Sequence, residues 1–216
     1  MKEKKSNSIW LIWAAITVLA PIILAIVLWN QLPTKIPIHW NIEGEADSFV
    51  PKIWAVVIFT LITLLLYGLL WFKNLNPKKN YTQFKTAFRW ITFSIATLMS
   101  LISCLIFLNS AGILFNLFKG IFTLLLLMPI AIGNFMGKLR PNHFIGIRNS
   151  WTLKNEEIWI KTHRLGGRIW ILGSLSVLIL LQATNLSFFA LFGLWLVVLL
   201  SPNLYSYILH KRIQEN

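Results

Sequence analysis

Residues 133–168 read GNFMGKLRPNHFIGIRNSWTLKNEEIWIKTHRLGGR and form a polar stretch between two strongly apolar regions. Hydrophobic residues make up 56% of the 216 positions. Charged residues make up 12% of the chain, whereas an average soluble domain has about 25%. The composition therefore indicates an integral membrane protein whose specific chemistry or recognition lies in this stretch or in the one other polar loop.

Long runs without charge predict six transmembrane helices. Each run holds at least the roughly 17 to 25 apolar residues that a spanning helix needs. The last run is too long for one span, but the polar segment 182–185 interrupts it, so we expect a helical hairpin there. The first run is longer than the core of a cleavable signal peptide, and we interpret it as a span. The predicted fold class is all-α, a polytopic membrane protein with spans at residues 9–29, 53–72, 90–108, 120–136, 169–181 and 186–205.

Positive charges alternate from loop to loop, and this pattern predicts the orientation of the chain. Most of the 20 Lys and Arg residues lie before the first span, within 73–89, within 138–168 or after the sixth span. The opposite connections carry only Lys35, Lys52 and Lys119. Because cytoplasmic loops are enriched in Lys and Arg, both termini are expected in the cytoplasm (N-in, C-in). The net charge of +13 is then mostly a signal of membrane orientation, and direct binding of nucleic acid is not expected.

The spans fall into two parts, each with one polar loop. Residues 1–72 form an N-terminal unit of two spans, and its outer loop, 30–52, contains three prolines that disfavour a continuous helix. We expect this outer loop to be compact and ordered. Residues 73–216 form a unit of four spans whose cytoplasmic inner loop is the polar stretch 133–168.

The inner loop is expected to contain irregular backbone followed by a short helix. Residues 142–150 follow a proline and lack a helical pattern. Thr152 is the expected N-cap, and an apolar face that begins at Ile158 fits a helix lying against the bilayer surface. Gly166 and Gly167 would then let the chain turn into the fifth span. Before the loop, Gly133 and Gly137 have the small-xxx-small spacing that is typical of a contact between membrane helices.

Sequence motifs for catalysis or metal binding are absent from the chain. There is no GxSxG turn, Walker loop, HExxH or CxxC pair. The spans are almost free of ionisable groups, which counts against proton-driven transport. His143 and His163 in the inner loop, or His39 in the outer loop, would bind a metal only if the fold brought further ligands to them. We therefore expect no enzyme, no catalytic residue, no metal and no cofactor.

Arg148, Trp151 and Trp159 are the residue types that dominate binding hot spots. An arginine that contacts lipid phosphates, with tryptophans at the membrane interface, would produce the same pattern. Spacing alone leaves both interpretations open.

The inner loop resembles the signature of the SdpI family, and the outer loop resembles a small domain of unknown function that is often fused ahead of that signature. The inner-loop residues that match are Asn134, Asn142, Gly146, Arg148, Trp151, Thr152, Glu157 and Trp159. The outer-loop residues that match are His39, Trp40, Asn41, Gly44 and Asp47. The chain departs from the family at Asn149-Ser150, where the family often has Thr-Pro. Loss of that proline removes a rigid turn.

The resemblance implies a multi-pass protein of the bacterial plasma membrane that acts by binding. The namesake of the family gives immunity to a secreted peptide toxin and is thought to sequester a cytoplasmic repressor. The partners implied here are therefore the lipid bilayer, a membrane-active peptide toxin at the outer loop and a cytoplasmic repressor at the inner loop. The matching residues are the candidate binding residues. The alternative is a membrane carrier or enzyme for a lipid or small anionic solute, with Arg148 holding the anionic group.

Overall fold

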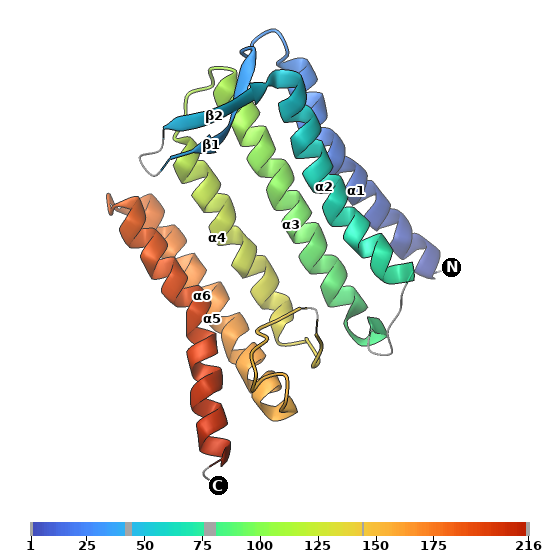
Figure 1. Ribbon diagram of the computed structural model, residues 1–216, viewed down its shortest axis with the longest axis vertical. Helices are drawn as coiled ribbons and strands as arrows, with labels where there is room; N and C mark the ends of the chain where they lie inside the picture. Colours follow the sequence, from blue (N-terminus) through green and yellow to red (C-terminus); the bar gives the residue numbers. More distant parts are fainter. Residues whose placement is uncertain (1, 42–44, 76–80, 144, 215–216) are drawn as a thin grey trace. The chain divides into compact units, whose positions relative to one another are not determined.

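The structure, a computed structural model, describes residues 2–41, 45–75, 81–143 and 145–214. These residues form six long helices and a pair of short strands (Figure 1). In chain order the elements are α1 (Lys2–Val27), β1 (Lys35–Trp40), β2 (Ala46–Pro51), α2 (Lys52–Leu75), α3 (Tyr81–Ser110), α4 (Leu117–Met136), α5 (Glu156–Ala183) and α6 (Phe188–Gln214).

Five helices of the described chain are long and apolar enough to cross a membrane, namely α1, α3, α4, α5 and α6. The apolar part of α2 for which side chains are described, Lys52–Gly68, is shorter. The sixth span and the orientation of the termini therefore stay predictions. The predicted helical hairpin at the end of the chain is confirmed, because α5 ends at Ala183 and α6 begins at Phe188.

The outer loop folds into a β-hairpin, so the all-α prediction was wrong at this point. β1 and β2 pair antiparallel, from Lys35 opposite Pro51 to Trp40 opposite Ala46. The prolines do disfavour a helix, as expected, but they are tolerated in a two-stranded ribbon, where each strand has an edge without a ladder partner. The register is irregular between Pro37 and Trp40.

The chain divides into two compact units. Unit 1 comprises Met1–Leu75 and Ile95–Leu124, and unit 2 comprises Asn76–Ser94 and Leu125–Asn216. The helices α3 and α4 thus contribute to both units. The division of the sequence near residue 72 stays a prediction about domains.

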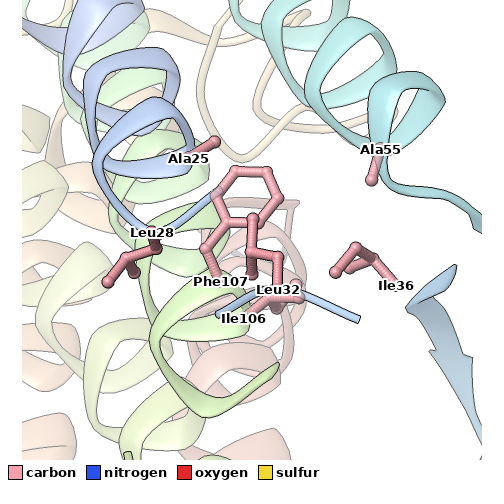
Figure 2. Packing of buried hydrophobic residues seen from close by; sticks show 7 residues of the cluster. All are labelled: Ala25, Leu28, Leu32, Ile36, Ala55, Ile106 and Phe107. Atoms are coloured by element: carbon pink, nitrogen blue, oxygen red, sulfur yellow. The ribbon is translucent and has the colours of Figure 1, made fainter. Parts of the chain in front are cut away.

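A small apolar core in unit 1 holds the hairpin at the ends of its helices. Phe107 of α3 is fully buried and meets the Phe59 ring of α2 edge-on, with ring centroids 5.6 Å apart. Ile36 of β1 is also fully buried in this core. Figure 2 shows the seven buried side chains of the cluster, which are Ala25, Leu28, Leu32, Ile36, Ala55, Ile106 and Phe107. The hairpin is therefore anchored through β1.

In unit 2, glycines allow α4 and α5 to approach closely. A Cβ atom on Gly133 would lie 2.7 Å from the carbonyl oxygen of Gly167, and one on Gly167 would lie 2.6 Å from that of Gly133. Gly166 faces Pro202 of α6, with its ideal Cβ 3.1 Å from the proline Cβ. The helix contact predicted for Gly133 is confirmed.

The predicted turn at Gly166 and Gly167 was wrong, because α5 continues straight through both residues. A glycine in a helix costs about 1 kcal/mol relative to alanine, and close packing against α4 and α6 offsets that cost. The N-cap is Asn155, whose side chain accepts the Ile158 N–H, so the assignment of Thr152 as the cap was also wrong. The apolar face at Ile158 is buried inside the protein and does not lie against the bilayer surface.

Candidate functional site

His163 is the buried polar centre of the inner loop. Its side chain is 1% exposed, and its Nε2 atom accepts the N–H of Ile147 at 2.9 Å. Its Nδ1 atom lies 2.8 Å from the carbonyl oxygen of Trp159. Because Nε2 accepts, the hydrogen bonds assign the neutral ring with its proton on Nδ1, which donates to Trp159. Both ring nitrogens are thus used to fix backbone, which makes His163 a structural residue rather than a metal ligand.

Gly146 and Trp159 both pack against this histidine. Gly146 has φ +119°, and a Cβ atom there would overlap His163 Nε2. The Trp159 ring is fully buried and stacks on the imidazole with centroids 4.1 Å apart. Its indole N–H donates to the carbonyl of Leu139 at 2.8 Å. These two candidate residues therefore set the shape of the loop. Trp159 is fully buried and not available to a partner, whereas Gly146 is exposed.

Thr152 and Asn149 close a tight turn in the inner loop. The Thr152 hydroxyl donates to the Ile147 carbonyl at 2.8 Å and accepts the Asn149 N–H at 3.0 Å. The Thr152 N–H in turn donates to Asn149 Oδ1 at 3.0 Å. Asn149 stands where the family often has threonine ahead of a proline, so side-chain hydrogen bonds fix this turn in place of a proline ring.

Trp151 fastens the loop to the C-terminal part of α6. Its indole N–H donates to Ser206 Oγ at 2.6 Å, and Asn149 Nδ2 donates to the same oxygen at 2.8 Å. The Trp151 ring also stacks on His210, with centroids 5.7 Å apart and planes 16° from parallel. The half-buried Trp151 is thus held on one side by α6.

The remaining inner-loop candidates differ in exposure. Asn142 is buried, and its side chain accepts the Ile145 N–H at 2.9 Å and donates to the Arg140 carbonyl at 2.8 Å. Arg148 is exposed and donates to the His143 carbonyl. Glu157 forms an exposed ion pair with Lys161 at 2.5 Å, and Asn134 is exposed on α4. Among these four residues, only the exposed ones can meet a partner without rearrangement of the loop.

The outer-loop candidates gather on the hairpin. His39 Nδ1 on β1 and Asp47 Oδ1 on β2 lie 2.6 Å apart, and both side chains are exposed. Two hydrogen bonds of 2.9 Å join Asn41 and Glu45. The Glu45 N–H donates to Asn41 Oδ1, and the Asn41 N–H donates to the Glu45 carbonyl. The Trp40 ring meets Phe118 edge-on at 6.4 Å between centroids. Gly44 lies outside the described residues.

Comparison with known proteins places these two loops in named families. Residues 138–206, which hold most of the inner loop, match the model of the SdpI/YfhL protein family. Over this region the chain is similar to the SdpI family. Residues 16–64, which hold the hairpin, match the domain of unknown function DUF1648. The Immunity protein SdpI of Bacillus subtilis (strain 168) is 28% identical over 150 residues, which are 68% of this chain and 69% of the relative. No solved structure matches the chain.

The similarity to SdpI and the five long apolar helices make the chain a multi-pass protein of the bacterial cell membrane. Within the described part of the chain, no three His, Cys, Asp or Glu side chains converge as metal ligands would.

The sequence did not point to the α6 residues that hold the inner loop. Ser206 and His210 contact a tryptophan more than 50 residues earlier, and no local pattern in the loop indicates them. A signal was present on α6 itself. Asn203, Ser206 and His210 lie at helical spacing and mark a polar face of this helix.

Proposed function

We propose that this protein protects a bacterial cell from a membrane-active peptide, and that it acts by binding rather than by catalysis. The observation that carries the proposal is the similarity to Immunity protein SdpI, which extends over 68% of the chain. The two family matches also include the two polar loops, and these are the places where a membrane-embedded chain can meet polar partners.

In this proposal α2 is the sixth span and both termini lie in the cytoplasm. α2 contains 24 residues, which is long enough for a membrane helix. Lys211 and Arg212 in the last turn of α6 lie on the proposed cytoplasmic side, as the distribution of positive charge requires. The hairpin is then the main structure that the protein presents outside the cell.

The hairpin has the chemistry to meet a cationic amphipathic peptide. The exposed carboxylate of Asp47 and the exposed Glu45 supply negative charge. Phe49 on β2 is 50% exposed and supplies an apolar surface beside them. Opposite charge speeds the encounter, and apolar contact holds the peptide once bound. The core around Ile36 keeps this surface in place.

In this proposal the inner loop either signals peptide binding to the cytoplasmic side or stabilises the protein there. Its proposed partner is a cytoplasmic repressor. Arg148 is the candidate contact, because its exposed guanidinium can meet a protein surface while its bond to the His143 carbonyl orients it. The buried network around His163 keeps the loop in one conformation.

The test is survival of a toxin-sensitive strain that expresses the parent, an empty vector or a variant, across a panel of membrane-active peptides. The variant carries His39→Ala with Asp47→Ala, and the matched control is Ser48→Ala, an exposed neighbour on β2. We expect protection by the parent and by Ser48→Ala, and reduced protection by the double variant at equal membrane levels. Equal survival with parent and empty vector would refute immunity, whereas equal protection by the double variant would refute only the role of the hairpin.

A further inference from the structure

A cavity of about 290 Å³ lies within unit 2, beside the inner loop. Its volume is close to the lower end of small-ligand pockets, roughly 300 Å³. Ile132 of α4, Trp170 of α5 and Leu199 of α6 line its walls, and Leu139 and Gly146 of the inner loop also line it. Apart from glycine, all lining residues carry apolar or tryptophan side chains.

This lining selects an apolar ligand. A buried water needs about two to four polar partners, which such walls do not provide. The helices that form the walls are long enough to cross a membrane, so a hydrocarbon chain is the apolar group at hand. An acyl chain that enters the cavity gains close packing contacts with walls that would otherwise lack partner atoms.

Positive charge stands next to the cavity. Lys138 and Arg140 are exposed and flank Leu139, which is one of the lining residues. Arg140 also forms an exposed ion pair of 4.0 Å with Glu156, so Lys138 is the principal cation of the site. The ammonium group of Lys138 lies 5.6 Å from the centre of the Phe135 ring, and Trp90 stacks on that ring at 5.4 Å. The residues that follow these two aromatics, Met136 and Ile91, also line the cavity. The cation–π contact therefore holds the Lys138 charge beside the cavity.

We propose that this cavity binds one acyl chain of an anionic phospholipid, with the phosphate beside Lys138 and Arg140. An apolar slot next to two cations matches a ligand that has an apolar tail and an anionic head. The site is separate from toxin recognition at the hairpin and does not depend on the proposed immunity function. Because Gly146 both lines the cavity and packs on His163, the bound chain also supports the inner loop.

The test is native mass spectrometry of the full chain, purified in mild detergent and mixed with phosphatidylglycerol or phosphatidylcholine of equal chain length. Leu199→Trp fills the cavity, and Leu200→Trp is the matched control because Leu200 is 61% exposed. Lys138→Gln removes the charge, and Lys154→Gln is its control on another exposed lysine. Thermal unfolding in detergent first confirms that each variant is folded.

We expect the parent and both controls to retain phosphatidylglycerol in preference to phosphatidylcholine. Leu199→Trp should retain clearly less phosphatidylglycerol than Leu200→Trp, because its side chain occupies the space of the acyl chain. Lys138→Gln should lose the preference for the anionic lipid. Equal lipid retention by Leu199→Trp and Leu200→Trp would overturn the proposal that the cavity binds the acyl chain. If Leu199→Trp does not fold, the test is Lys138→Gln, and an unchanged lipid preference in that variant would overturn the proposal. Equal retention of both lipids, or of a free fatty acid, by the parent would overturn the assignment to an anionic phospholipid.

Discussion

Replacement of Gly146 by alanine should loosen the inner loop strongly. The glycine has φ +119°, where a residue with a side chain is strained by about 1–3 kcal/mol. The new Cβ atom would also overlap His163 Nε2 and lie 3.2 Å from Cη2 of Trp159. Those two side chains are 1% and 0% exposed, so they have no room to move aside. If the hydrogen bond from the Ile147 N–H is lost as well, a buried donor without a partner costs about 1–3 kcal/mol more.

The combined cost of about 3 kcal/mol corresponds to about a hundredfold shift toward the open loop, at 1.4 kcal/mol for each factor of ten. Hydrogen–deuterium exchange in detergent, read on a peptide that covers residues 145–153, measures this opening directly. The matched control is Gly137→Ala, because a Cβ atom at Gly137 would make only an ordinary contact of 3.7 Å with Arg164 Cγ. Exchange in Gly146→Ala that is no faster than in Gly137→Ala would refute the argument from close packing on the histidine.

Three further predictions concern the attachment of the loop, its partner contact and the orientation of the chain. Trp151→Phe and Ser206→Ala each remove the same hydrogen bond and should each destabilise the loop by about 0.5–1.5 kcal/mol. The double variant should therefore cost less than the two single changes added together, which a double-mutant cycle on thermal unfolding measures. Arg148→Ala should lower protection of a sensitive strain more than Lys154→Ala at equal membrane levels, and equal protection by both would argue that the loop is only a connector. An impermeant thiol reagent should fail to label Asn80→Cys in intact cells, in a chain whose native cysteine is replaced by alanine, and labelling there would overturn the proposed topology.

The sequence predicted those parts of the fold that depend on long apolar runs. The break between α5 and α6 follows from a polar segment within an apolar run, and the irregular backbone after Pro141 follows from the loss of helical pattern. The contact at Gly133 was predictable because small residues at this spacing favour close helix packing. Each of these features is set by residues close together in the chain.

Features set by distant partners were not predictable in the same way. Gly166 and Gly167 suggested a turn, yet the backbone of α4 and the side chain of Pro202 explain why glycines are needed inside a continuous helix. Thr152 and Asn155 are both suitable cap residues. Thr152 is not the cap because its hydroxyl is used within the tight turn of the loop. The hairpin was missed because its strands are short and contain proline, which weakens the alternating pattern of a strand.

The residues that carry the family resemblance have different structural roles. These roles decide how the effects of their variants should be interpreted. Thr152 and Trp159 are buried and Gly146 packs on the buried His163, so a change at any of the three alters the shape of the loop before any partner is involved. Trp151 is half-buried and tied to Ser206, so reduced protection by Trp151→Ala would reflect detachment from α6 as much as a lost contact. Arg148 projects from the same loop with an exposed side chain, and its bond goes to a backbone carbonyl of the loop. A loss of protection by Arg148→Ala, with hydrogen exchange of the loop unchanged, would therefore identify a partner contact in a way that none of the buried positions can.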